Sequence, residues 1–318
     1  MKQTERLVGF YDVHIQSHSR TFEAPNTIST LKAMELLMSL PAESRISENK
    51  AGTQIAYIKD AAQNGDVFHL LINKCDKELA DPAFSNPKAS QWRTADRAAG
   101  EGLDFSCHIV IRTSDNPLVR ATALVEVCQG LPIVFIQRFL NNLMRDVKRV
   151  RPEEFVFPHP DGAVENNGRV RTYNTYFRFQ FDGHPSNELE DDLETGSIGD
   201  VELIDYRTAA THMDQHGYIR EVSKRLQIRM ENGAPGSKVT RLKAFLAQRS
   251  PSYSNARIRF KTDDGVGRSV TVRTDDFMVG ADTIFVKKER IHNFVNRLKQ
   301  SYTSFNAETI EKMRALLD

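Results

Sequence analysis

The sequence lacks several features that would assign a protein class at once. It has three cysteines, one tryptophan and no apolar run near the roughly 18 residues that a membrane-spanning helix needs. Its first residues also lack the uninterrupted apolar core of a signal peptide. We therefore expect a cytoplasmic protein that has no membrane partner.

Motifs for metals and cofactors are missing as well. Cys75, Cys107 and Cys128 are widely separated and lie in apolar, strand-like sequence, so they suit reduced, buried thiols better than a disulfide framework. Neither a CxxC pair nor a paired histidine spacing occurs, and the sequence therefore predicts no metal site built on them. The glycine-containing loop ENGAPGS (231–237) precedes a predicted basic helix, and the N-terminus of such a helix can hold phosphate. The GxxxxGK[ST] pattern of a P-loop is absent, however, so this signal is weak and the cofactor is left open.

The length and charge of the chain favour two domains. At 318 residues it exceeds the size at which one hydrophobic core usually stops growing. Residues 1–200 carry 22 Lys or Arg against 28 Asp or Glu, whereas residues 201–318 carry 21 against 14. We expect an N-terminal domain over residues 1–182, an acidic linker or loop over 183–200, and a basic C-terminal domain over 201–318.

The hydrophobic patterns predict a mixed α+β fold. The N-terminal domain begins with a strand at 6–15 and a helix within 27–40, capped by Thr27 or Ser29. An Asn64-Gly65 turn joins two further strands, and such short connections favour a mainly antiparallel sheet with packed helices. The C-terminal region reads as a smaller basic α+β domain with a hairpin (255–261 and 267–273) and helices near 213–226, 238–250, 289–302 and 306–318.

Two neighbouring strands, 104–112 and 121–128, hold the best candidates for catalysis. Period-two alternation places Asp104 and His108 on the polar side of the first strand and Glu126 on the polar side of the second. If Arg112 faces Thr122, His108 lies directly across from Glu126. If the register is shifted by one residue, the side chains of His108 and Glu126 lie on opposite faces of the sheet and form no cluster. The alternative interpretation is the ordinary polar face of a hairpin.

An acidic residue followed by a spacer and a glutamate resembles the motif of restriction-endonuclease-like nucleases. The resemblance implies that Asp104 and Glu126 hold a divalent cation such as Mg²⁺, which activates water at a phosphodiester. The sequence departs from the motif at Cys128, where that family has lysine. His69 and His108 raise a second hypothesis of paired general acid–base histidines, but Leu71 and Val110 replace the Thr or Ser of two-histidine phosphoesterases.

Basic residues supply the candidates for nucleic-acid contact. The helix that starts near Pro132 ends in a cationic tail, which either complements the helix dipole or contacts phosphate. The predicted C-terminal hairpin carries outward basic residues as well. The loop 81–100 holds Trp92, which either stacks on a ligand or, as we expect more often of such a residue, pins its loop to the core. The predicted contact residues are Arg145, Lys148, Arg149, Arg151, Arg257, Arg259, Lys261 and Arg273.

The chain as a whole resembles uncharacterised bacterial proteins found near mobile-element and anti-phage genes. The stretches that carry the resemblance are EGLDFSCHIVI (101–111) and GLPIVFIQRFLNNLMR (130–145). It implies host defence, with nucleic acid as the sensed ligand. Our expectation is a nucleic-acid-binding component of a bacterial defence or regulatory system. The alternatives are the metal-dependent nuclease and a non-catalytic subunit that binds a partner protein.

Overall fold

The structure is a computed structural model that describes residues 2–164, 168–205, 223–230, 236–281 and 283–317. The chain divides into two compact units. Unit 1 comprises Met1–Gly9, Val13–Gln180 and Glu289–Asp318, and unit 2 comprises Phe10–Asp12 and Phe181–Lys288. Among the described residues, no helix combines the length and the apolar character that crossing a membrane requires.

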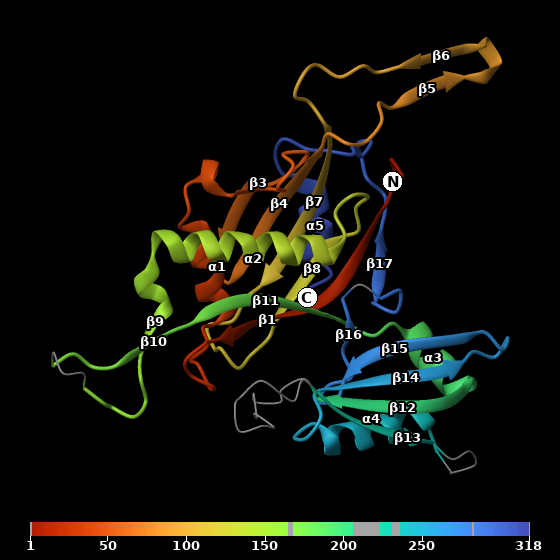
Figure 1. Cartoon of the computed structure of the whole chain (residues 1–318). Helices are drawn as coiled ribbons and strands as arrows, with labels where there is room; N and C mark the ends of the chain where they lie inside the picture. The colour runs from red at the N-terminus through yellow and green to blue at the C-terminus, as the bar shows by residue number, and fades with distance from the viewer. Residues whose placement is uncertain (1, 165–167, 206–222, 231–235, 282, 318) are drawn as a thin grey trace. The chain divides into compact units, whose positions relative to one another are not determined.

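Unit 1 is built on a mainly antiparallel sheet in the strand order β11-β1-β8-β7-β4-β3-β2, with β17 paired to β1 (Figure 1). The predicted Asn64-Gly65 turn joins β3 to β4, and Gly65 has a φ of +63°, which that turn requires. The strands are β1 Arg6–His18, β2 Ile46–Glu48, β3 Gln54–Asn64, β4 Val67–Asp76, β7 Leu103–Arg112, β8 Ala121–Glu126, β11 Tyr176–Gly183 and β17 Lys288–Ile291. Two small hairpins complete the unit: β5 Ala83–Asn86 with β6 Gln91–Thr94, and β9 Val156–Pro158 with β10 Thr172–Asn174.

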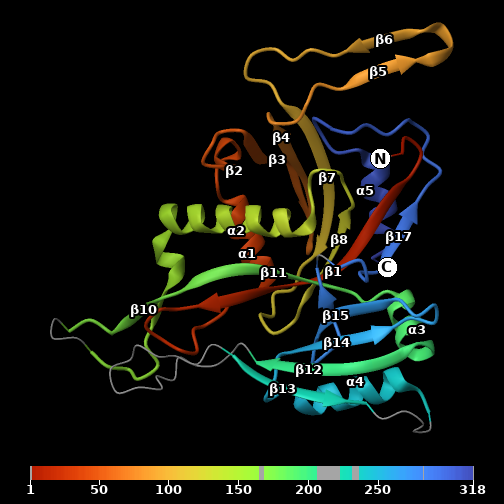
Figure 2. The ribbon, with the colours of Figure 1, turned by 45° about the vertical axis from the view of Figure 1, so that its right-hand side comes forward.

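Helices cover both faces of this sheet. Helix α1, Thr30–Met38, is capped by Ser29 as the sequence predicts, and α2, Ile133–Val150, starts after Pro132. Both lie on one face, while α5, Ala307–Arg314, lies on the other (Figure 2). The predicted apolar stripe of α2 is buried in the core between helix and sheet: Ile136, Phe139, Leu140, Leu143 and Val147.

Unit 2 is a smaller set of antiparallel strands with two helices, and its strands belong to the same continuous sheet as those of unit 1. Its strand order is β13-β12-β14-β15-β16, and β16 pairs with the last residues of β11. Helix α3 contacts α4, β12 and β14. The elements are α3 Asn187–Thr195, β12 Ser197–Asp205, β13 Lys224–Arg229, α4 Lys238–Arg249, β14 Asn255–Lys261, β15 Gly267–Arg273 and β16 Val279–Gly280. The mixed α+β class predicted for both parts is therefore confirmed.

The boundaries between the parts differ from those predicted. The acidic segment 183–200 is not a linker, because Ser186 caps α3 and Leu189 and Leu193 of that helix are fully buried. Two buried leucines a turn apart suffice to dock a short helix whose other positions are charged. The last residues, Glu289–Asp318, belong to unit 1 rather than to a C-terminal domain.

Two predicted helices are not found in the described chain. Residues 292–302 form no helix, because their backbone groups are used by distant partners: the N–H of Leu298 donates to Gln3, and the N–H of Ser106 donates to the carbonyl of Gln300. Of the helix predicted near 213–226, residues up to 222 lie outside the described residues, and the remainder begins strand β13. Helices α4 and α5 and the hairpin β14–β15 agree with the prediction.

Candidate functional site

The register of β7 and β8 brings two of the three catalytic candidates together. Arg112 faces Thr122, which is the register predicted to place His108 across from Glu126. The Nδ1 atom of His108 lies 2.7 Å from Oε2 of Glu126, and the backbone N–H of His108 donates to the same oxygen at 3.1 Å. Both side chains are fully buried.

Arg6 completes a buried charge network around Glu126. Its Nε donates to Oε1 of Glu126 at 2.6 Å, and its guanidinium also donates to the carbonyl of Lys299. Burial opposes ionisation of Glu126, but the hydrogen bonds from His108 and the charge of Arg6 outweigh it and lower the pKa of Glu126. The carboxylate is therefore charged, and both of its oxygens are bound by groups of the protein itself.

The second nitrogen of His108 is also occupied. The backbone N–H of Asn306 donates to its Nε2 at 3.1 Å, so the ring proton lies on Nδ1 and is donated to Glu126. Tyr302 packs against the same ring. With both nitrogens satisfied and no solvent exposure, His108 holds the segment before α5 onto the sheet and has no free atom for a substrate.

Asp104 belongs to a different group of contacts. Four residues along β7 separate it from His108, which is about 13 Å of extended chain, so it does not join Glu126. It accepts hydrogen bonds from Tyr57 at 3.1 Å, from Asn73 at 2.7 Å and from the hydroxyl of Ser301. Burial and the Asp104 charge raise the pKa of Tyr57 to about 12. Within the described chain, no three His, Cys, Asp or Glu side chains form a group that could hold a metal ion.

The two histidines of the second catalytic hypothesis share a face of the sheet. His69 pairs with Val110 and His108 pairs with Leu71, so the rings are diagonal neighbours on adjacent strands. The chain before α5 covers both of them, since Phe305 packs against His69. Burial is the main cause that lowers the pKa of His69. His108 therefore lies within the core, whereas His69 lines a pocket of about 510 Å³ together with Phe305 and residues of α5.

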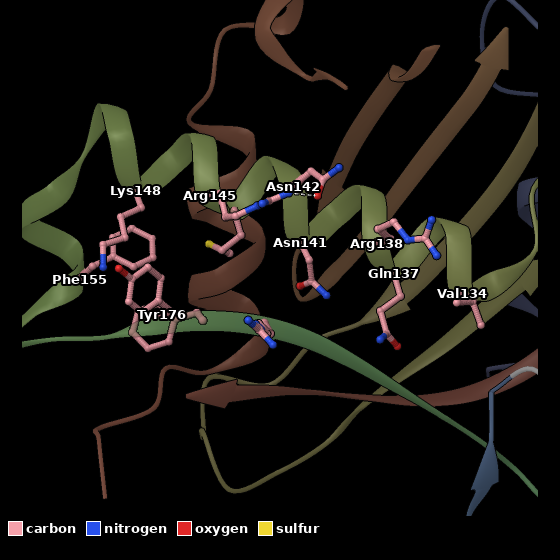
Figure 3. Close-up of a pocket in the computed structure, with 12 residues that line it drawn as sticks. Val134, Gln137, Arg138, Asn141, Asn142, Arg145, Lys148, Phe155 and Tyr176 are labelled. Carbon is pink, nitrogen blue, oxygen red and sulfur yellow. Dashed lines mark hydrogen bonds between the residues drawn. The ribbon is translucent and has the colours of Figure 1, made fainter. Parts of the chain in front are cut away.

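The basic residues of α2 open onto a groove of about 330 Å³ between α2 and β11 (Figure 3). Asn141 fixes its width, because its side chain donates to the carbonyl of Phe179 at 3.1 Å and accepts from the N–H of Phe179 at 2.7 Å. Gln137 and Asn141 point from α2 toward the strand. The lining consists of Val134, Gln137, Arg138, Asn141, Asn142, Met144, Arg145, Lys148, Phe155, Tyr176, Phe177 and Arg178.

Four of these lining residues are cations, and the described lining contains no Asp or Glu. Arg138 and Arg178 are exposed, and neither makes a hydrogen bond or ion pair with any residue that the structure describes. Arg145 donates to the amide oxygen of Asn142. These guanidinium groups are therefore available to an anion, and none has to leave a carboxylate first.

Lys148 closes one end of the groove. Its Nζ lies 3.5 Å from the centroid of the Tyr176 ring and donates to the carbonyl of Thr175 at 2.9 Å. Burial and the nearby charge of Arg20 lower the pKa of Lys148. Lys148 thus adds positive charge at this end of the groove, while its ammonium is already held by the Thr175 carbonyl and the Tyr176 ring.

The structure separates the predicted contact residues into two groups. Arg145 and Lys148 line the groove, whereas Arg149 pairs with Asp146 outside it, and Arg151 is the exposed residue that ends α2. Sequence reasoning missed Arg138 and Arg178. The signals that could have found them are the helical spacing of 138, 141, 145 and 148, and the outward position of 178 between two buried phenylalanines.

The basic residues of unit 2 do not form one patch of unpaired charge. Arg273 is held by Asp182 and Asp275, and Arg257 lies 3.7 Å from Glu202. Arg259 and Lys261 are exposed on β14. Arg273 is therefore an internal ion-pair partner and not the outward residue that was predicted.

A phosphate site was also conceivable at the N-terminus of α4, after the glycine-containing loop 231–237. Residues 231–235 lie outside the described chain, but the helix N-terminus is described, and the carboxylate of Glu194 occupies it. That carboxylate accepts from the N–H groups of Lys238 and Val239, both at 3.0 Å, and from the hydroxyl of Ser237. The protein thus supplies its own anion to this helix.

Known proteins add no assignment to this geometry: no protein-family model matches the sequence, and no curated protein matches it significantly.

Proposed function

We propose that this protein binds single-stranded nucleic acid in the cytoplasm, through the groove between α2 and β11 of unit 1. The observation that carries the proposal is the set of four cations, Arg138, Arg145, Lys148 and Arg178, in one groove whose described lining contains no carboxylate. Phosphodiesters are the anions that such a set of cations commonly binds in proteins.

The chemistry of the cations suits phosphate oxygens. Arginine presents planar donors that match two oxygens at once, and three of the four cations are arginines. Arg138 lies on α2 and Arg178 on β11, so each of the two walls of the groove contributes an exposed cation.

The size of the groove favours a single strand. Its volume of about 330 Å³ is at the lower end of the range, roughly 300 to 1,000 Å³, in which small ligands are bound. Such a groove admits one nucleotide unit at a time and is too small for a base-paired duplex. Unpaired nucleotides are also the usual targets of proteins that contact bases.

The biological setting of the proposal comes from the sequence. The resemblance to proteins encoded near anti-phage and mobile-element genes implies a role in bacterial defence or regulation. A single strand exposed during infection or transposition would then be the sensed ligand.

The test is binding of fluorescently labelled oligonucleotides, measured by anisotropy from about 50 to about 200 mM salt. Single-stranded DNA and RNA should bind, and the logarithm of affinity should fall with the logarithm of salt concentration, with a slope of roughly −0.7 for each phosphate contacted. Equal binding of duplex DNA would contradict the single-strand proposal. Failure of every oligonucleotide to bind at the lowest salt would reject nucleic acid altogether and favour a protein partner.

A further inference from the structure

The hairpin β5–β6 has no core of its own. Every residue from 83 to 94 is exposed, including all eight residues of the two strands. Figures 1 and 2 show the hairpin extending beyond the ends of β4 and β7. An isolated two-stranded hairpin is marginally stable in water, so a ligand that covers it would add to its stability.

The base of the hairpin is nevertheless fixed to the sheet. Arg97, in the segment that follows β6, forms an ion pair with Asp81, in the segment that leads into β5, and also donates to the carbonyl of Lys77. Gly102 lies so close to the other stem that an added Cβ would be 2.7 Å from the Sγ atom of Cys75 and 2.7 Å from the backbone of Asp76. The hairpin is therefore presented from a defined position.

Trp92 stands alone on one face of this hairpin. Its side chain is 69% exposed, and the residue opposite is Ser85. The neighbouring pair, Phe84 and Arg93, belongs to the other face, where the guanidinium of Arg93 covers the Phe84 ring at 4.5 Å. The sequence analysis expected this tryptophan to pin its loop to the core, and that expectation is wrong. The indole instead offers an open aromatic surface.

The charge of the hairpin indicates what meets that surface. Residues 83–94 contain Lys88 and Arg93 and no Asp or Glu. An exposed indole on a hairpin whose charged residues are all cations suits an unpaired base on an anionic backbone, because every base has a π-face and every linkage carries a negative charge. A partner protein would be favoured instead by an apolar patch continuous over both faces, but on the second face Arg93 covers Phe84.

We propose that Trp92 stacks on an unpaired base of the same single strand whose phosphates bind in the groove between α2 and β11. The inference rests on the proposed function and deepens it, since it makes the hairpin β5–β6 a second contact with the ligand. Stacking supplies affinity without sequence preference, and the groove supplies the charge contacts.

Trp92 is the sole tryptophan of the chain, so its fluorescence reports on this hairpin alone. Adding unlabelled oligo(dT) should quench the emission, with a midpoint that matches binding of labelled oligo(dT) measured by anisotropy. Trp92→Ala should weaken that binding about tenfold, and Trp92→Phe, which keeps a ring, should weaken it less. Phe84→Ala is the matched control on the opposite face, and binding should change less than twofold.

Each other outcome has one meaning. Oligo(dT) that binds by anisotropy while the Trp92 emission and the Trp92→Ala affinity stay unchanged overturns this inference and leaves the groove as the binding site. Equal losses for Phe84→Ala and Trp92→Ala overturn stacking in favour of a general apolar contact. An emission change that depends on protein concentration without oligo(dT) indicates self-association through the hairpin and also overturns it. Absence of oligo(dT) binding, together with failure of the other single-stranded DNA and RNA oligonucleotides to bind, rejects the proposed function itself.

Discussion

The imidazole of His108 and the carboxylate of Glu126 form a 2.7 Å contact that is closed to solvent. Arg6 pairs with the other carboxylate oxygen, and the N–H of Asn306 binds the far side of the imidazole. The network thereby ties a residue near the N-terminus and the segment before α5 to the centre of the sheet. Its geometry fits a structural role in unit 1, and the open cations lie elsewhere, in the groove between α2 and β11.

We expect Glu126→Gln to lower the free energy of unfolding by about 3 to 5 kcal/mol, because it leaves the guanidinium of Arg6 buried without its counter-charge. Urea denaturation measures this change. The exposed Glu43 is the matched control, and Glu43→Gln should shift stability by no more than about 0.5 kcal/mol. Equal stability of the two variants would mean that the buried network contributes nothing.

The same carboxylate gives a pH dependence whose direction is fixed. The pKa of Glu126 in the folded protein lies below the value of 4.5 expected in the unfolded chain. Its contribution to stability is therefore fully present above about pH 4.5 and is lost as the pH falls through the folded-state pKa. Urea midpoints measured through this range should fall more steeply for the wild-type protein than for Glu126→Gln. Parallel curves would contradict the shift.

The three thiols should differ in reactivity. Burial raises the pKa of both Cys107 and Cys128, and in Cys128 the neighbouring Cys107 raises it further. Because the thiolate is the reactive species, these two thiols should resist a disulfide reagent in the folded protein, while the half-buried Cys75 reacts first. The measurement is the release of chromophore before and after denaturation. Cys75→Ser is the control, and fast reaction in that variant would contradict the structure.

Local sequence signals predicted the elements with strong periodicity or clear turn chemistry. Three such predictions are confirmed: the Asn64-Gly65 turn, the Ser29 cap and the apolar stripe of α2. Each depends on residues close together in the sequence and little on distant ones. The register of β7 and β8 was left as two alternatives. The structure has the one in which Arg112 faces Thr122, and this register allows the buried contacts of His108 with Glu126 and with the distant Asn306.

The errors arose where distant residues determine the local structure. Residues 292–302 form no helix because their backbone groups form hydrogen bonds with Gln3 and Ser106. These partners are distant in the sequence, so no local pattern predicts them. The sequence predicted only two of the four cations that line the groove. Arg178 lies on a strand 40 residues beyond Arg138, and the position of that strand opposite α2 depends on the hydrogen bonds between Asn141 and Phe179. Trp92 was misjudged because a tryptophan is usually buried, and its hairpin lies outside the core.

The central claim is that the groove between α2 and β11 holds the phosphates of a single strand. Its most direct test is the affinity of the double variant Arg138→Ala/Arg178→Ala for labelled single-stranded oligonucleotide, measured by anisotropy across a salt series. Both residues are exposed and unpaired within the described chain, so the fold should be unaffected. The control is Arg149→Ala, on the same helix but outside the groove. We predict an affinity loss of about tenfold or more and a salt slope smaller by roughly 1.4, with the control within about twofold of wild type. Equal affinities and slopes for the double variant and the wild-type protein would contradict the claim.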